Sequence, residues 1–129
     1  MRSKAFTMIE LLTAVVIIGI LAAIAMPNYL HFVEKARADQ AITYLKVIRT
    51  GELIYFANND LYVRCDNATD IKTNLGVEIT TEYYTFTVLG NSSLTTSFIA
   101  TARRNNGGAT ITLTNANTWG GTSTFRPSN

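Results

Sequence analysis

The sequence predicts an α+β fold in which one long N-terminal helix packs, over its second half, against a small antiparallel sheet of three to four strands. Residues 6–26 are almost entirely apolar, and an amphipathic helical pattern follows them directly. Beyond residue 82, short segments rich in β-branched and aromatic residues alternate with polar turns. The helix and the sheet each have an apolar face, and we expect these faces to cover each other.

Composition narrows the classes of function. The 129 residues amount to one domain, and the net charge of +2 comes from Arg2 and Lys4, because the remaining basic and acidic side chains number nine each. This balance gives no general support to nucleic-acid binding. Cys65 is the single cysteine, so no disulfide forms within the chain, and cysteine usage does not indicate a redox compartment.

Residues 6–26 have the length of a membrane span. A helix of these 21 residues is about 31 Å long, close to the ~30 Å hydrocarbon thickness of a bilayer. Arg2 and Lys4 place the preceding end in the cytoplasm by the positive-inside rule. Glu10 is the one acid inside the span, and such an acid costs about 2.5 to 3.5 kcal/mol at the bilayer centre and less near the interface.

Other interpretations of this stretch compete. A plain single-pass anchor fits its length but leaves Glu10 unexplained. A secretory signal peptide cut after Ala25 also fits, because Ala23-Ile24-Ala25 has the small-x-small pattern, and it would release a soluble secreted binding domain. Against this alternative, the apolar run exceeds the usual length of about 7 to 15 residues, and the helical pattern continues beyond the cut.

Residues 5–12 (AFTMIELL) and 19–27 (GILAAIAMP) resemble the N-terminal signature of type IV pilins and of the related type II secretion pseudopilins. The resemblance implies the pilin fold, with a leader at 1–5, a transmembrane and filament-core helix at 6–28, and a globular head at 29–129 that includes the amphipathic half of the helix. It also implies that a prepilin peptidase cuts between Ala5 and Phe6 and that Phe6 is then N-methylated. The family usually has Gly where this chain has Ala5.

Glu10 has a physical role in this interpretation. The free amine of Phe6 and the carboxylate of Glu10 are both costly in lipid, and pairing the amine of one subunit with the carboxylate of the next lowers both costs. Such a head-to-tail contact does not close, so it grows a helical filament. From the residues alone, a Glu10 side chain that reaches the lipid headgroups explains the sequence equally well, and the resemblance favours the pair.

Gly19 and Pro27 bracket the second part of the apolar run. Pro27 lacks an amide hydrogen and clashes with the carbonyl four residues earlier, so we expect the helix to kink or open locally between these positions. The resemblance implies that this segment loses helical order in an assembled filament. An ordinary kinked membrane helix predicts the same residues.

The rest of the chain supplies the head. Ala38, Ala41, Leu45 and Ile48 recur at helical spacing, so one helix is predicted over about 7–57, with Gly51 as a weak point that costs about 1 kcal/mol relative to Ala. Residues 60–82 are predicted as a loop with at most a short helical turn at 70–75. Strands are predicted at 83–89, 97–102 and 109–114, with turns at 90–93 and 105–108. Trp119, in the C-terminal segment 115–129, is expected to pack on the sheet edge.

The sequence predicts no enzyme, no cofactor and no metal site. His31 is the only histidine, and no nucleophile and base are paired in the pattern. Asp60, Asp66 and Asp70 lie in one loop, whereas the calcium site of the major pseudopilins lies near the C-terminus, where residues 115–129 contain no acid. Arg103 and Arg104 are a candidate contact for nucleic-acid phosphates, but two charges are weak evidence and a solvated turn is the default explanation.

Together these features predict a structural subunit of a type IV pilus-like filament, with a pseudopilin of a type II secretion system as the alternative of the same fold. The resemblance implies copies of the chain, the prepilin peptidase and the pilus assembly machinery as partners, with membrane lipid before assembly. It implies a single pass through the cytoplasmic (inner) membrane before assembly, and a place at the cell surface or in the periplasm afterwards. Adhesion and motility are the roles that the family suggests.

Overall fold

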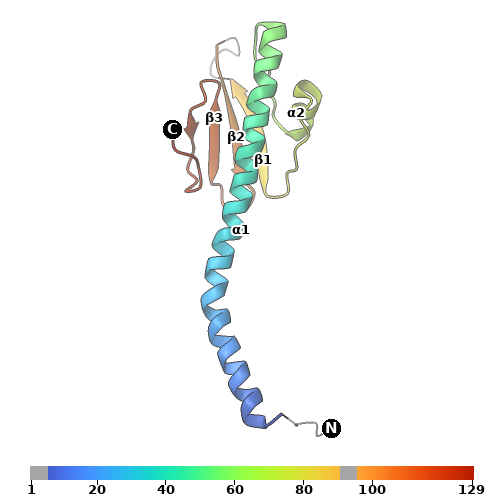
Figure 1. Cartoon of the computed structure of the whole chain (residues 1–129). Helices are drawn as coiled ribbons and strands as arrows, with labels where there is room; N and C mark the ends of the chain where they lie inside the picture. Colours follow the sequence, from blue (N-terminus) through green and yellow to red (C-terminus); the bar gives the residue numbers. More distant parts are fainter. Residues whose placement is uncertain (1–5, 91–95) are drawn as a thin grey trace. The chain divides into compact units, whose positions relative to one another are not determined.

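The computed structural model of the chain describes residues 6–90 and 96–129 (Figure 1). It divides into two compact units, Met1–Lys35 and Ala36–Asn129, which are described separately below. The helices are α1 (Met8–Asn59) and α2 (Ala68–Leu75), and the strands are β1 (Tyr84–Gly90), β2 (Phe98–Arg104), β3 (Thr110–Thr114) and β4 (Trp119–Gly120). The predicted α+β fold, with a long helix and a four-stranded sheet, is confirmed.

Helix α1 agrees closely with the prediction. It begins at Met8 and continues without a break through Pro27 to Asn59. At its end the side-chain amides of Asn58 and Asn59 donate to the carbonyls of Ile54 and Tyr55, four residues earlier in each case. Asp60 then takes a positive φ of 56°, which turns the chain out of the helix.

The sheet is an antiparallel meander in the order β1-β2-β3-β4. Buried and less buried residues alternate along β1, β2 and β3, as expected when one face of a sheet covers a core. The predicted strands begin one residue before the observed ones and end within two residues of them. A turn was predicted at 90–93. Gly90 is the last residue of β1, and residues 91–93 lie outside the described residues.

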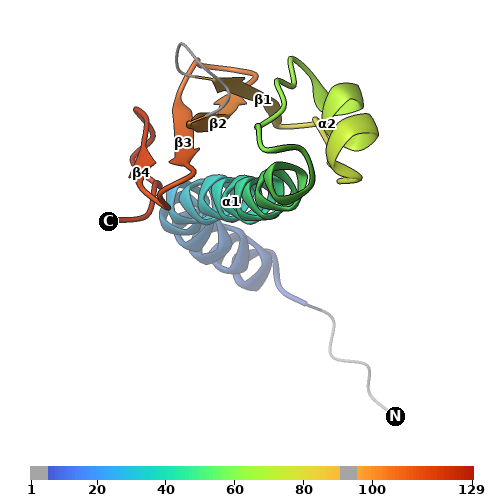
Figure 2. The same cartoon turned by 90° about the horizontal axis from the view of Figure 1, so that it is seen from above.

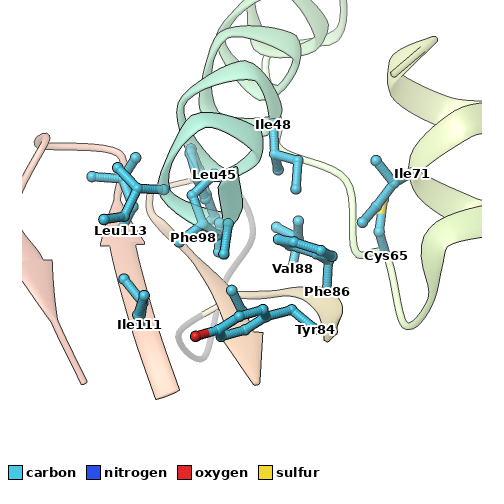
Figure 3. Close-up of a cluster of buried hydrophobic side chains, with 14 of the residues drawn as sticks. Leu45, Ile48, Cys65, Ile71, Tyr84, Phe86, Val88, Phe98, Ile111 and Leu113 are labelled. Atoms are coloured by element: carbon cyan, nitrogen blue, oxygen red, sulfur yellow. The ribbon is translucent and has the colours of Figure 1, made fainter. Parts of the chain in front are cut away.

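The core of the second unit forms between α1 and the sheet. Figure 2 shows the second half of α1 covering one face of the sheet, with α2 beside the β1 edge. Leu45 and Ile48 point from α1 toward Val88 and Phe98, and all four side chains are fully buried (Figure 3). Ala38 and Ala41 on the same helix face are also buried, and their small side chains allow close approach of the sheet.

Aromatic pairs extend this core beyond the aliphatic residues. Tyr44 meets Phe86 edge to face, with ring centroids 5.6 Å apart. Tyr62 contacts two rings, stacking on Phe56 at 4.6 Å and meeting Phe98 edge to face at 4.8 Å. The segment that follows α1 is therefore held against both the helix and the sheet.

Helix α2 is longer than the predicted turn. The side chain of Asn67 caps it by accepting a hydrogen bond from the backbone N–H of Asp70 at 2.9 Å, and Gly76 ends it with a φ of 67°. Gly51 faces the end of this helix, where a Cβ added to Gly51 would lie 3.1 Å from the Cβ of Leu75. The predicted weak point is thus a position at which a small residue allows close packing.

Trp119 lies at the sheet edge, as predicted. It is buried and belongs to the two-residue strand β4, in which it is the partner of Leu113. The Asn129 side chain accepts from the Trp119 backbone N–H and donates to its carbonyl oxygen, so it continues the pairing on the other side of Trp119. Arg49 on α1 donates twice to the carbonyl oxygen of Asn115, which fixes the loop before β4.

Gly121, which follows β4, provides a test of this edge. Its φ is 101°, and an added Cβ would collide with the carbonyl group of Thr110. Gly76 also has a positive φ, but no heavy atom lies within 4 Å of an added Cβ there, so Gly76→Ala is the matched control. We expect Gly76→Ala to cost about 1 to 2 kcal/mol, and Gly121→Ala to cost about 1 to 3 kcal/mol more, because it adds a steric conflict to the backbone strain.

The measurement is thermal unfolding of the detergent-solubilised full chain, followed through the fluorescence of Trp119. Equal losses of stability in the two variants would contradict the close packing of Gly121 on β3.

Candidate functional site

The first half of α1 is apolar on every side. Sixteen large apolar residues from Phe6 to Phe32 are more than half exposed, including four consecutive ones, Val15, Val16, Ile17 and Ile18. Consecutive helical positions are 100° apart, so four of them cover nearly the whole circumference. A helix that is apolar all round is stable in a membrane or in a protein core. By length and composition α1 contains a candidate membrane span, and none of that span is buried against the rest of the described chain.

Glu10 is held by a capping box at the start of this helix. Its Oε2 atom accepts hydrogen bonds from the backbone N–H and the side-chain hydroxyl of Thr7, both at 2.9 Å. In return the Glu10 backbone N–H donates to Thr7 Oγ1 at 3.3 Å. Thr7 is thus the N-cap of α1 and Glu10 the third helical residue, the arrangement that satisfies two otherwise unpaired donors at a helix start.

The capping box changes the interpretation of Glu10. The sequence suggested a second subunit or the lipid headgroups as partners of the acid, and the cap was missed, although the Thr-x-x-Glu spacing before an apolar run was the available signal for it. The cap and the positive end of the helix dipole stabilise the carboxylate within one chain. Among the described residues, both hydrogen bonds to the carboxylate end on Oε2, and Oε1 accepts none.

Thr13 is the other polar side chain of the apolar span that carries a hydroxyl. Its Oγ1 donates to the carbonyl oxygen of Ile9 at 2.7 Å. A hydroxyl bonded to its own helix exposes its methyl group and needs no external partner. The apolar span is therefore compatible with lipid at Thr13 as well as at its aliphatic positions.

The predicted processing site lies beside the cap. Ala5 is outside the described residues, and Phe6, which directly precedes the Thr7 cap, is 83% exposed. A cut between Ala5 and Phe6 would leave Thr7 and Glu10 in the mature chain, so the capping box would be retained. Gly19 and Pro27 lie farther along the helix, which is unbroken at both positions, so local opening there stays a prediction for an assembled state.

The remaining sequence candidates lie apart from this site. His31 is on α1 with its ring edge-on to Phe32, 6.4 Å between centroids. Asp66 pairs with Arg64 at 2.8 Å, and Asp70 accepts from the backbone N–H of Asp66 at 3.0 Å. These carboxylates therefore order the loop around the start of α2. Within residues 6–90 and 96–129, no cluster of three or more His, Cys, Asp or Glu side chains is placed to hold a metal.

Arg103 and Arg104 lie at the end of β2, at the edge of the second unit. Arg103 is exposed, whereas Arg104 lines a cavity of about 280 Å³ together with Arg37, Glu82 and Tyr83. The guanidinium of Arg37 lies 4.2 Å from the centre of the Tyr83 ring. An acid within this cluster reduces its attraction for phosphates, so the geometry adds no support for nucleic-acid binding.

Comparison with known proteins agrees with the geometry of α1. A family described as the prokaryotic N-terminal methylation motif matches residues 1–26. The chain is 44% identical over 61 residues to the type IV major pilin protein PilA of Myxococcus xanthus (strain DK1622), which covers 47% of this chain and 28% of that protein. It is 28% identical over 114 residues to the type IV major pilin protein PilE of Neisseria gonorrhoeae, covering 88% of this chain and 58% of that protein.

A fimbrial protein of Moraxella nonliquefaciens is 37% identical over 86 residues, covering 63% of this chain and 50% of that protein. The chain thus spans between 28% and 58% of the length of these three relatives. The match at 1–26 coincides with the capped, apolar half of α1, and the longer matches extend into the head. The methylation motif and these relatives make the chain similar to type IV pilins.

Proposed function

We propose that this chain is the structural subunit of a type IV pilus-like filament, held in the membrane by the first half of α1 and polymerised through it. The observation that carries the proposal is a helix segment that is apolar on every side, is not covered by the other described residues, and begins with a capped acid. A membrane before assembly and neighbouring helices afterwards provide the two environments in which such a segment is stable.

The processing proposed here is removal of residues 1–5 by a prepilin peptidase and methylation of the new amine on Phe6. The methylation motif that matches residues 1–26 supports it. The capping box also supports it, because Thr7 and Glu10 lie just after the cut and fix the helix start independently of the leader.

For assembly, we propose that the Phe6 amine of one subunit approaches Glu10 of its neighbour. Thr7 occupies Oε2, so Oε1 is left to accept a bond from another subunit among the groups described. An amine and a carboxylate that meet in an apolar surrounding attract each other strongly, and the contact sets the axial register. Because the contact joins different surfaces of two copies, it propagates along a filament.

The names of the relatives, type IV major pilin and fimbrial protein, favour a pilus over a secretion pseudopilus. The further partners proposed are the assembly machinery and, before assembly, the lipid of the cytoplasmic membrane. The filament would then lie at the cell surface. No catalytic role is proposed, since the relatives are named as pilin and fimbrial proteins.

The mature N-terminus tests the processing step. We expect mass spectrometry of the purified mature protein to find a chain that begins with N-methylated Phe6, because the cut precedes the capped helix. An Ala5→Gly variant, which has the residue usual in the family, is the control and should give the same terminus. A mature chain that begins at Met26 would instead establish cleavage as a secretory signal peptide and overturn the filament proposal.

Three substitutions separate the two roles of Glu10. Glu10→Gln keeps an oxygen that accepts from Thr7 but removes the charge, so we expect normal membrane insertion and at least tenfold fewer filaments, since about 1.4 kcal/mol lost per contact corresponds to tenfold. Thr7→Val removes the hydroxyl of the cap but keeps the charge, and it should retain most assembly. Glu10→Ala removes both and should assemble least.

The measurement is the mass of sheared filaments relative to the amount of processed subunit in membranes. Filament yields from Glu10→Gln at the wild-type level, with Thr7→Val defective, would show that the acid acts through the cap alone.

A further inference from the structure

Glu52 is an acid in the core of the second unit. It lies on the buried face of α1 and has no exposed surface. Its Oε2 atom accepts a hydrogen bond from the backbone N–H of Val63 at 3.0 Å. Its Oε1 atom is buried and has no hydrogen-bond partner among the described residues.

This environment disfavours the ionised carboxylate. Burial raises the pKa of Glu52 from its usual 4.5 to about 7, and the single bond from Val63 offsets the effect only in part. A neutral carboxyl group with one oxygen unpaired costs far less in a core than a charged one with the same partner. The protonated form is therefore the form that fits the closed structure.

The neighbouring titratable groups do not offset the negative charge that Glu52 would carry when ionised. Cys65 lies on the segment that contacts Glu52, and burial raises the pKa of its thiol to about 11, so it stays neutral. From α2 the Cys65 sulfur accepts from the side-chain amide of Asn74 at 3.8 Å. Asp66 and Asp70, at the start of α2, are acids that also raise the pKa of the Cys65 thiol, and they supply no positive charge to an ionised Glu52.

The hydrogen bond between Val63 and Glu52 holds residues 61–66, a segment that also pairs with the edge of the sheet. Two residues beyond Val63, Cys65 pairs with Val88 of β1 through two backbone hydrogen bonds, of 3.1 Å and 2.7 Å. This pairing covers part of the outer edge of β1, and the thiol beneath it is fully buried. The anchoring of residues 61–66 thus depends on Glu52 at one point and on β1 at the next.

We propose that Glu52 is a proton-dependent latch on residues 61–66. When its carboxyl group is protonated, the segment stays closed on α1 and β1. When the group ionises, the closed state loses this stabilisation and the segment opens more often, so that water can reach the carboxylate, and opening exposes Cys65 and the outer edge of β1. The proposal concerns the head alone and does not depend on the filament function.

The direction of the pH effect follows from linkage. The closed state binds the proton more tightly than the open state, so closing is favoured at low pH and becomes less favoured as pH rises from about 4.5 to about 7. Above that range both states are ionised, and the equilibrium levels off. Across this window the open fraction increases on the order of a hundredfold.

Hydrogen exchange of backbone amides in the full chain, in detergent micelles at pH 4.5 to 8, tests the latch. After correction for the intrinsic exchange rate, we expect the protection of the Val63 and Cys65 amides to fall on the order of a hundredfold and then to level off. In Glu52→Gln, which keeps the acceptor for Val63, protection should not change with pH. The amides of Ala100 and Ala102 in the central strand β2 are the internal control.

Wild-type protection that is constant across this range, or an equal pH dependence in Glu52→Gln, would overturn the proposal. If the Glu52→Gln variant does not fold, a second measurement on the wild-type chain still tests the proposal. The ¹³C chemical shift of the Glu52 carboxyl carbon in the wild-type chain should titrate with a midpoint near 7, and a midpoint near 4.5 would refute the latch.

Discussion

The packing of α1 on the inner face of the sheet is the interaction on which the rest of the structure depends. Ala38, Ala41, Leu45 and Ile48 form one buried stripe, and it is the only face of α1 that the described sheet and loops cover. Because this contact secures the second half of the helix in the head, the first half continues into an environment that the head does not supply. One continuous helix must therefore suit two surroundings, a polar-faced domain and an apolar medium.

Several polar groups in the apolar half of α1 form hydrogen bonds within the helix itself, which makes this half compatible with an apolar medium. The Thr7 and Glu10 capping box pairs the first donors of the helix, and Thr13 bonds within its own turn. The capped helix start and the hydrogen bond of Thr13 lower the cost of surrounding this segment with lipid, and one carboxylate oxygen of Glu10 accepts no bond among the described residues. The same oxygen is the point at which the proposed pairing with a second subunit would act, so insertion and assembly use one site.

The sequence predicted the fold wherever periodicity was strong. The apolar span and the helical spacing of Ala38, Ala41, Leu45 and Ile48 predicted both ends of α1 to within two residues. The alternation of apolar and polar residues predicted three of the strands. β4 was not predicted as a strand because two residues show no alternation, and α2 was predicted only as a short turn at 70–75 because its Asn67 cap depends on a side-chain geometry that many polar loops resemble. Glu52 gave no signal either, since an acid on an amphipathic helix is expected to face solvent. For the site, the position of Glu10 was predicted but its partner Thr7 was missed.

The central claim, that the first half of α1 exchanges lipid for neighbouring subunits, is tested most directly by spin-label accessibility. A label on Val16→Cys reports on the apolar span, one on Leu45→Cys reports on the head core, and Cys65→Ser removes the native thiol. In membranes the account predicts high access of dissolved oxygen to position 16, and in filaments a strong loss of that access, with position 45 inaccessible in both. Oxygen access at position 16 that is unchanged between membranes and filaments would contradict the account.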